Sequence, residues 1–543
     1  MIVADDGDID RVEDPYALGR GFISHGKVAI EGAETTSYVS RAAIDPKLQP
    51  TADLHIQRLG AISQITLDAA PVNWKVGGTV IIPSTDWNGS SVTRTITAIN
   101  GNQLTIDQPL PDWKPWLPVV DATLRAHVGY LDRNVVFVSE NKTDPKRAGH
   151  IMFMHNPNVS VKYARFDSTG RTDKINAAVN DPVVDAQGVL QPGTGTNPRG
   201  RYALHFHHTI GDGSMQALVK GCAITSPNSW GAVNHDSNVA FEDNIVTNAQ
   251  GAAFVTEIGT EIGRFTRNMV VDVSADKVTK LDLSSTNLDW GRGGSAFFMV
   301  GFAPPIVGAV IAGIKDADDA IDIFAWRAAV LDDNGKPAYA QVFVSNLDPA
   351  VAAQIAKGRS IVGNNEVPFT VKNVVAYSSK SLLIQHSHPG GFLNTVDNAV
   401  IYGGWNGVGD QYSPGLTVTN SKFYGQMFGA GFGNDWKSQL RIENTAIKGF
   451  HYGVVVPQNG TTYLNSLDLA NVANLVFARV DQYQSLEIAP RSQVIGEDLT
   501  FGRGESYGYW TPGATRTTWT DLLIPNDGPL PAGIETGLDT SIA

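Results

Sequence analysis

Phe241-Glu-Asp-Asn-Ile-Val246 is a short strand-like stretch that runs into an asparagine and continues as a second short strand. The pattern returns at Phe265-Thr-Arg-Asn-Met-Val270, Thr370-Val-Lys-Asn-Val-Val375, Thr395-Val-Asp-Asn-Ala-Val400, Leu416-Thr-Val-Thr-Asn-Ser421 and Leu440-Arg-Ile-Glu-Asn-Thr445. Successive repeat asparagines lie 22 to 25 residues apart, except for one gap of 105 residues between Asn268 and Asn373. Self-similarity at this period is typical of a solenoid of stacked coils.

The composition of the repeats indicates which kind of solenoid this is. They contain short alternating strands, glycines and a corner asparagine, and they lack the helical stretch of leucine-rich or ankyrin repeats. Asparagine tolerates the left-handed conformation at a tight corner, and stacked asparagines form hydrogen-bonded ladders. We therefore expect an all-β chain, a right-handed single-stranded parallel β-helix with a small N-terminal β domain.

The strand and turn signals divide the chain into three parts. Residues 1–130 contain short strands separated by turns such as Asn88-Gly89 and Asn100-Gly101, which predict the small β domain and a linker. Residues 131–480 are expected to form the β-helix, with insertions at about 175–201 and 314–365. From about residue 481 the repeat fades, so residues 481–543 are expected to form a C-terminal cap and tail.

Composition excludes several classes of function. Of the 543 residues 42% are apolar and 17% charged, which allows a large core, and the net charge of -13 argues against non-specific nucleic-acid binding. Cys222 is the only cysteine, so an intramolecular disulfide and a thiolate metal cluster are excluded. The uncharged stretch 293–314 is interrupted by Pro304-Pro305, which favours two strands over a membrane span. No signal peptide is evident after Met1.

Histidines gather in one part of the chain. Eight of the twelve lie in two groups: His150, His155, His205, His207, His208 and His235, then His386 and His388. In the stretch 204–208, strand alternation turns Leu204 and Phe206 toward the core, so His205 and His207 are expected to point outward.

The repeat register predicts which residues of successive coils share one column. Counting 13 residues past the repeat asparagines gives Glu257, His386 and Gln411, and 13 or 14 residues past Gly221 lie Asn234 and His235. Because stacked coils lie about 4.8 Å apart, His235 and Glu257 should be neighbours. His205 and His207 fall one coil earlier and His155 one coil before that, whereas His386 belongs several coils away.

Imidazoles beside carboxylates suit two chemistries. In the first, His155, His205, His207 and His235 hold a divalent metal such as zinc or calcium. In the second, His207 and His235 transfer protons, with Asp236, Glu257 and Glu261 as neighbouring carboxylates. The alternative is that these are ordinary outward polar side chains. No organic cofactor is expected, because phosphate-binding loops are absent from the sequence.

Cations and aromatic residues surround this part of the chain. Arg171, Arg201 and Arg292 are candidates for holding a substrate carboxylate. Trp230 and Trp290 could stack on sugar rings. Each of the five could instead serve the fold alone.

Several stretches carry a resemblance to a known family. Gly19-Arg-Gly-Phe-Ile-Ser-His-Gly-Lys27 and Trp74-Lys-Val-Gly-Gly-Thr-Val-Ile-Ile82 resemble the end of the eight-glycine domain of fibrocystin and of the cell-migration-inducing hyaluronan-binding proteins. The match continues at Gly149-His-Ile-Met-Phe-Met-His155, Arg201-Tyr-Ala-Leu-His-Phe-His-His208, Val233-Asn-His-Asp-Ser-Asn238 and Phe254-Val-Thr-Glu-Ile-Gly-Thr-Glu261. It covers roughly residues 17–310, and the single cysteine is typical of a bacterial relative.

The resemblance implies a glycan-related function outside the cell. Hyaluronan-binding members of the family are associated with calcium-dependent depolymerisation, whereas fibrocystin has no established enzymatic role. We therefore expect a secreted or cell-envelope polysaccharide depolymerase for an acidic, uronate-containing glycan such as a hyaluronan-like polymer. A lyase is favoured over a hydrolase. The alternative is a non-catalytic glycan-binding or adhesion module. In both cases the partner is a polysaccharide, with no nucleic acid and no membrane span, and the oligomeric state stays open.

Overall fold

A computed structural model describes residues 1–41, 63–275, 291–325, 369–478, 491–501 and 516–523. Short gaps within these ranges lie at 86–88, 112, 114–123, 211–213, 258–260, 301–303, 315–318, 388–393, 412–414, 426–429, 435–438, 451, 457–458 and 471–473. The only helical segment of the described residues is a 3-10 turn at Pro145–Arg147.

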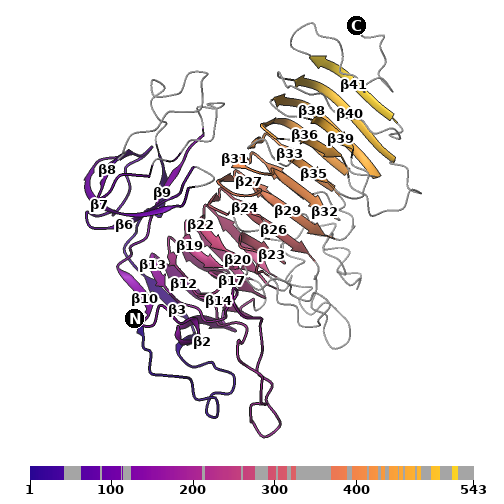
Figure 1. Ribbon diagram of the computed structural model, residues 1–543. Helices are drawn as coiled ribbons and strands as arrows, with labels where there is room; N and C mark the ends of the chain where they lie inside the picture. Colours follow the sequence, from indigo (N-terminus) through magenta and orange to yellow (C-terminus); the bar gives the residue numbers. More distant parts are fainter. Residues whose placement is uncertain are drawn as a thin grey trace.

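Parallel strands stack into a long β-helix with three strands in most coils (Figure 1). The first face contains β1 (Ile2–Val3), β10 (Val135–Ser139), β13 (Ala164–Asp167), β16 (Ala223–Thr225), β19 (Ile245–Gln250), β22 (Met269–Ser274), β25 (Val310–Ala312), β28 (Val375–Tyr377), β31 (Val400–Gly404) and β34 (Lys422–Gly425). The prediction of an all-β parallel β-helix is confirmed.

The second face carries the histidines. It contains β2 (Gly21–Ser24), β11 (His150–Met154), β14 (Leu204–His207), β17 (Ala232–His235), β20 (Ala252–Thr256), β23 (Ser295–Met299), β26 (Ile321–Ala325), β29 (Leu383–Ser387), β32 (Val408–Gln411), β35 (Ala430–Asn434), β37 (Tyr452–Val456) and β39 (Asn474–Ala478). The described strands of this sheet pair in parallel, so equivalent residues of successive coils form straight columns.

The third face completes each coil. It contains β3 (Val28–Glu31), β12 (Val159–Lys162), β15 (Ala217–Lys220), β18 (Asn238–Glu242), β21 (Ile262–Thr266), β24 (Ile306–Val307), β27 (Thr370–Lys372), β30 (Asn394–Asp397) and β33 (Gly415–Thr419). Four longer strands follow: β36 (Gln439–Lys448), β38 (Asn459–Ala470), β40 (Arg491–Phe501) and β41 (Arg516–Leu523). The last two continue the parallel stack, so residues 491–501 and 516–523, which were expected in the cap, are further strands of the β-helix.

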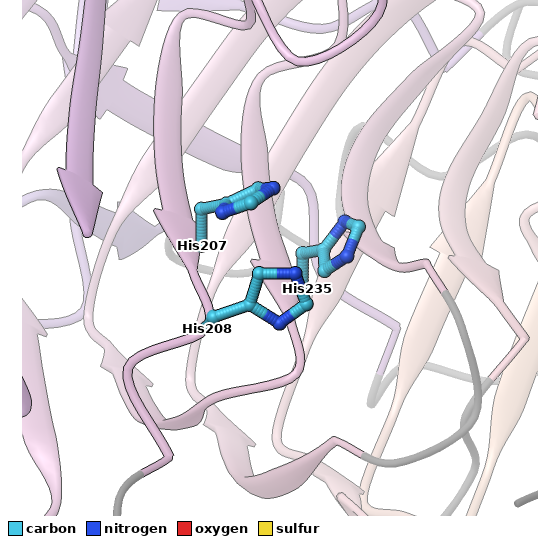
Figure 2. Close-up of side chains that lie close together, drawn as sticks. All are labelled: His207, His208 and His235. Atoms are coloured by element: carbon cyan, nitrogen blue, oxygen red, sulfur yellow. The ribbon is translucent and has the colours of Figure 1, made fainter. Parts of the chain in front are cut away.

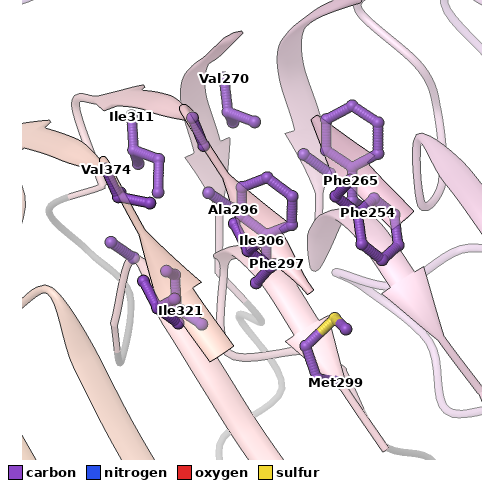
Figure 3. Packing of buried hydrophobic residues seen from close by; sticks show 14 of the residues in the cluster. Phe254, Phe265, Val270, Ala296, Phe297, Met299, Ile306, Ile311, Ile321 and Val374 are labelled. Carbon is purple, nitrogen blue, oxygen red and sulfur yellow. The ribbon is translucent and has the colours of Figure 1, made fainter. Parts of the chain in front are cut away.

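Apolar side chains from all three faces fill the interior of the coils. Phenylalanines stack along the axis: the ring of Phe254 lies 5.1 Å from that of Phe297 (Figure 3). In the same way the ring of Phe241 lies 5.3 Å from that of Phe265. Burial of these columns supplies the main driving force for stacking the coils. The strand alternation that places Phe206 in this core turns its neighbours His205 and His207 outward.

The corner asparagines follow two patterns. Asn373, Asn398, Asn420 and Asn444 have the expected left-handed conformation, with φ between 46° and 54°. In the earlier coils the left-handed residue is the preceding one, and Asn244 and Asn268 are buried, with the Asn244 amide donating to Asn268 Oδ1 at 3.0 Å. Both arrangements satisfy corner amides through the stack.

The small β domain is an insertion in the β-helix. It consists of β4 (Tyr38–Ser40), β5 (Gln64–Thr66), β6 (Thr79–Ile82), β7 (Val92–Asn100), β8 (Gln103–Ile106) and β9 (His127–Tyr130), paired antiparallel. Strands β1 to β3, expected in that domain, instead pair in parallel with β10 to β12 and form the first coil.

The two expected insertions differ from the prediction in detail. Residues 175–201 form a loop with isolated bridges between Asn180 and Asn197 and between Val184 and Leu190. Within 314–365, β26 belongs to a coil, because it pairs with β23 and β29, and residues 326–368 lie outside the described residues. No helix of the described residues has the length and apolarity to cross a membrane.

Candidate functional site: a histidine cluster on the second face

The register of the second face confirms the predicted column. Met154 pairs with His207 and His207 with His235, and Glu257 follows Thr256, the partner of Asn234. The amide of Glu257 donates to the Asn234 carbonyl at 3.2 Å, which extends the same register by one residue. The column continues through Phe324, His386 and Gln411, so His386 lies three coils beyond Glu257 and outside the cluster.

A left-handed corner adds a second column beside the first. His155, His208 and Asp236 each follow a strand of the second face and have φ of 57°, 51° and 48°. The His208 amide donates to the His235 carbonyl at 3.0 Å, as a stacked coil requires. This corner turns the His208 side chain toward the imidazoles of the first column, although simple strand alternation assigns it to the other face.

Four imidazoles therefore crowd together, three of which are drawn in Figure 2. The His207 ring lies 4.2 Å from that of His208 and 4.6 Å from that of His235, and His208 lies 4.9 Å from His235. His205 adds a fourth ring 5.2 Å from His207. His155, predicted as a metal ligand, is exposed and lies more than 6 Å from the rings of His207 and His208.

The cluster contains two sets of three possible metal ligands, and within each set one ligand atom of every residue lies within 4.8 Å of the other two. The first, which we call the inner trio, consists of His205, His235 and Glu257. The second, the outer trio, consists of His207, His208 and His235. His235 belongs to both sets, with Nδ1 2.6 Å from Glu257 Oε2.

The inner trio fits a transition-metal ion. His205 is fully buried, and its Nδ1 lies 2.9 Å from the Gly200 carbonyl, which fixes Nδ1 as the donor and leaves the lone pair on Nε2. That Nε2 has no hydrogen-bond partner and lies 3.9 Å from Glu257 Oε2. Both atoms could be ligands of one ion at about 2.1 Å, whereas a water donating to both would hold its acceptors roughly 4.5 Å apart.

Two neighbouring residues hold Glu257 of the inner trio in place. The Tyr202 hydroxyl donates to Glu257 Oε1 at 2.9 Å, and the Glu257 amide donates to Glu261 Oε1 at 3.0 Å. Tyr202 and Glu261 are fully buried, so these contacts are shielded from water. Metal ligands are typically oriented by such second contacts.

His208 and Asp236 form a separate dyad at the edge of the cluster. His208 Nδ1 lies 2.8 Å from Asp236 Oδ2, with 38% of the His208 side chain exposed and 1% of that of Asp236. A buried carboxylate that holds Nδ1–H directs the Nε2 lone pair of the imidazole toward the open side. This is the geometry of a general base oriented by a carboxylate.

Burial and charge separate the acid–base properties of the cluster. Burial lowers the pKa of His205 to about 3, and burial together with the neighbouring histidines lowers the pKa of His207 to about 2. Burial opposes the charge of His235 too, yet Glu257 raises its pKa overall. Burial likewise opposes the charge of Glu257, but His235 and His205 bring its pKa well below the usual range. His205 and His207 are thus neutral lone-pair donors and poor proton acceptors near neutral pH.

The predicted substrate-binding arginines serve the fold in the structure. Arg171 is buried and donates to the carbonyls of Ala17, Gly19 and Arg20. Arg201 is 9% exposed and donates to the carbonyls of Ala17 and Tyr16. Both guanidinium groups attach the N-terminal segment to the β-helix, so they are not placed to hold a substrate.

The other predicted substrate contacts are buried or undescribed. Trp230 is 2% exposed, and its indole N–H donates to the Gly291 carbonyl at 2.5 Å. Lys174 lies over its ring, 3.8 Å from the centroid, so no sugar reaches that face. Arg292 is 4% exposed and lies 3.5 Å from the Asp173 carbonyl, and Trp290 lies outside the described residues.

Two residues of the site, His208 and Tyr202, are not among the predicted site residues, whereas Glu261 is one of the carboxylates expected beside the histidines. His208 could have been found from the corner itself, because histidine is enriched among left-handed non-glycine residues. Tyr202 lies just before the strand that carries His205, and nothing in its spacing marks it as a hydrogen-bond partner of Glu257.

Comparisons with known proteins give only distant likenesses. No family model matches the chain, and no curated protein matches it in sequence. The chain is similar to the tailspike gp61 of Pseudomonas phage phi297, with 8% identity, a TM-score of 0.24 and coverage of 97% of this chain and 66% of that one. It is also similar to the tailspike gp49 of Pseudomonas phage LKA1, with 10% identity, a TM-score of 0.24 and coverage of 94% and 63%.

A third solved structure is the gp54 tailspike of Acinetobacter baumannii bacteriophage AP22 in complex with A. baumannii capsular saccharide. It is 8% identical, with a TM-score of 0.19 and coverage of 99% of this chain and 68% of that one. The chain thus spans less than two thirds of the length of the first two tailspikes. Likenesses this weak carry no information on activity.

Proposed function

We propose that the protein is a metal-dependent polysaccharide lyase, secreted or located in the cell envelope, that cleaves an acidic, uronate-containing glycan by elimination. The observation that carries this proposal is the inner trio, in which the buried, unpartnered Nε2 of His205 faces the carboxylate of Glu257 at 3.9 Å. Nδ1 of His235 lies 2.6 Å from the same carboxylate oxygen, so a cation at this position would be attracted by Glu257 and meet the free lone pair of His205.

The donor set favours zinc over calcium. Two imidazole nitrogens and one carboxylate oxygen form a ligand set that zinc accepts at catalytic sites, with a further position open to substrate. Calcium takes six to eight oxygen ligands instead. When bound, such an ion supplies positive charge that neutralises the carboxylate of a uronate and so acidifies the hydrogen on its C5 carbon.

The dyad of His208 and Asp236 is the proton acceptor of this proposal. Nε2 of His208 takes the C5 proton while the C4–O4 bond breaks and its electron pair leaves with O4. A C4–C5 double bond forms, and O4 then takes a proton. Asp236 holds the Nδ1 proton of His208 throughout, at the 2.8 Å contact already present. This assigns to His208 the role predicted for His207 or His235.

Hydrolysis by a pair of carboxylates has less support. An acid catalyst must carry a proton near neutral pH, whereas the pKa of Glu257 is well below the usual range. Asp236 is fully buried against His208, so it has no access to a glycosidic oxygen.

The glycan itself is supported by shape and by sequence. A stack of coils presents a long repetitive face, which suits an extended repetitive polymer. The stretches that resemble the eight-glycine family, including those around His207 and His235, favour a hyaluronan-like glycan within the uronate class.

The test is a lyase assay on a panel of uronic polymers with one equivalent of zinc. Elimination creates unsaturated uronates, which are detected by ultraviolet absorbance. We expect His208→Gln to abolish this signal and His155→Gln, an exposed neighbour, to retain it. New reducing ends without this absorbance would show that the reaction is hydrolysis and not elimination. Glycan binding without any product would favour the non-catalytic binding module.

A further inference from the structure

The outer trio is a second binding position for a divalent metal. We infer that an ion bound by His207, His208 and His235 inhibits the enzyme when metal is in excess. This inference rests on the proposed function, because it describes regulation of the same site. One atom from each of the three imidazoles lies within 4.8 Å of the others.

The other contacts of each imidazole indicate which of its nitrogen atoms this position would use. Asp236 accepts the Nδ1 proton of His208, so the lone pair of His208 is on Nε2. Nδ1 of His235 faces Glu257 and the inner trio, so Nε2 is the atom of His235 that belongs to the outer trio, and its lone pair becomes available only on loss of a proton. His207 is half-buried, and its Nδ1 is buried without a hydrogen-bond partner. Three imidazoles that converge in this way form a good site for zinc or copper.

The outer position binds more weakly than the inner one. It has no carboxylate ligand, and an ion in the inner trio repels a second dication nearby. With Nδ1 of His235 bound to the inner ion, the second ion must also replace the Nε2 proton of His235, which passes to solvent. His235 then bridges the two ions as an imidazolate. His208, the most exposed of the three, gives the second ion a path from solvent.

Occupation of the outer trio removes the proton acceptor. The Nε2 lone pair of His208 binds the ion and is no longer available for the C5 proton. Loss of a general base lowers a rate about 10²-fold or more. Lyase activity should therefore rise with the first equivalent of zinc and fall again at higher concentrations.

Metal stoichiometry tests the inference without any activity measurement. The full chain, stripped with a chelator, is dialysed against rising Cu²⁺, and bound copper is counted. We expect two ions for the wild type and for the control His155→Phe. We expect one ion for His207→Phe and for His207→Gln. The glutamine variant is the control for misfolding, because its polar side chain disturbs the site less than phenylalanine does.

Electron paramagnetic resonance of the same samples identifies the bridge. Two copper ions joined by an imidazolate couple magnetically, so the wild-type signal should lose intensity as the second ion binds. The His207 variants should keep the full signal of one isolated ion. A single site in the wild type, or two uncoupled ions, would overturn the inference and leave the inner trio intact. No bound copper at all would instead overturn the metal of the proposed function.

Discussion

Asp236→Asn is the sharpest test of the proposed proton acceptor. Asp236 is fully buried and accepts from Nδ1 of His208 at 2.8 Å, so its charge fixes the tautomer of that imidazole. It has φ of 48°, a conformation that asparagine tolerates, so the corner should keep its shape. An amide at this position can donate to Nδ1 and shift the proton to Nε2, where it blocks proton transfer.

The size of the effect follows from the contacts of the dyad. A carboxylate-to-amide exchange in a fully buried catalytic triad costs about 10⁴ in kcat. His208 is 38% exposed, so water also solvates its imidazole and softens the loss. We expect kcat to fall by about 10² to 10³, which corresponds to roughly 3–4 kcal/mol of transition-state stabilisation.

The assay combines initial rates of ultraviolet absorbance with zinc content at one equivalent of zinc. Zinc should remain bound, because the inner trio does not include Asp236. The matched control is Asp243→Asn, another left-handed corner, with φ of 54° and a surface contact to Arg267, and it should keep the wild-type rate. A wild-type rate in folded, zinc-loaded Asp236→Asn would refute the assignment of His208 as the base. Loss of zinc from this variant would instead indicate that the metal site lies closer to His208 than the inner trio does.

Three further outcomes are expected. Arg171→Ala removes three hydrogen bonds to the carbonyls of Ala17, Gly19 and Arg20, of which Ala17 keeps its bond from Arg201 and Arg20 its bond from the His150 amide, so the free energy of unfolding should fall by about 3 kcal/mol and residues 1–20 should become protease-sensitive while zinc stays bound; unchanged proteolysis would contradict this. Gly263→Ala places a Cβ 2.1 Å from the Val239 carbonyl at φ of 117° and should cost about 3 kcal/mol in chemical denaturation, against about 1 kcal/mol for Gly188→Ala, which meets nothing within 4 Å. Zinc affinity, followed by competition with a chelator, should rise with pH and level off above the pKa of His235, which Glu257 raises, because protons and metal compete for its Nδ1; a flat profile would exclude His235 as a ligand.

The column of the site was predictable because coil length is nearly constant. Glu257, His386 and Gln411 were placed in one column by counting from the repeat asparagines, and the strand register agrees. The left-handed corner residue is Asn373 itself in one coil but the residue before Asn244 in the other, a difference of one residue. The strands after these corners are nevertheless in register, so the count still reaches the same column.

Side-chain partners were harder to predict than columns. Arg171 and Trp230 lie in sequence beside the cluster, yet one attaches the N-terminal segment and the other is covered by Lys174. Each outcome depends on how a loop or a distant segment returns to the coils, and the periodic pattern does not encode that. His208 was missed for a local reason, since one left-handed residue overrides the alternation of a strand.

The split first coil has a consequence for the order of folding during synthesis. Strands β2 and β3 pair with β11 and β12, which leave the ribosome only after the whole inserted domain. At translation rates of about 5–20 residues per second, the edges of β2 and β3 wait roughly ten seconds for their partners. Each later coil instead pairs with a coil that has already been synthesised and folded. The nascent first coil is therefore the stage at which we expect a chaperone to be needed most.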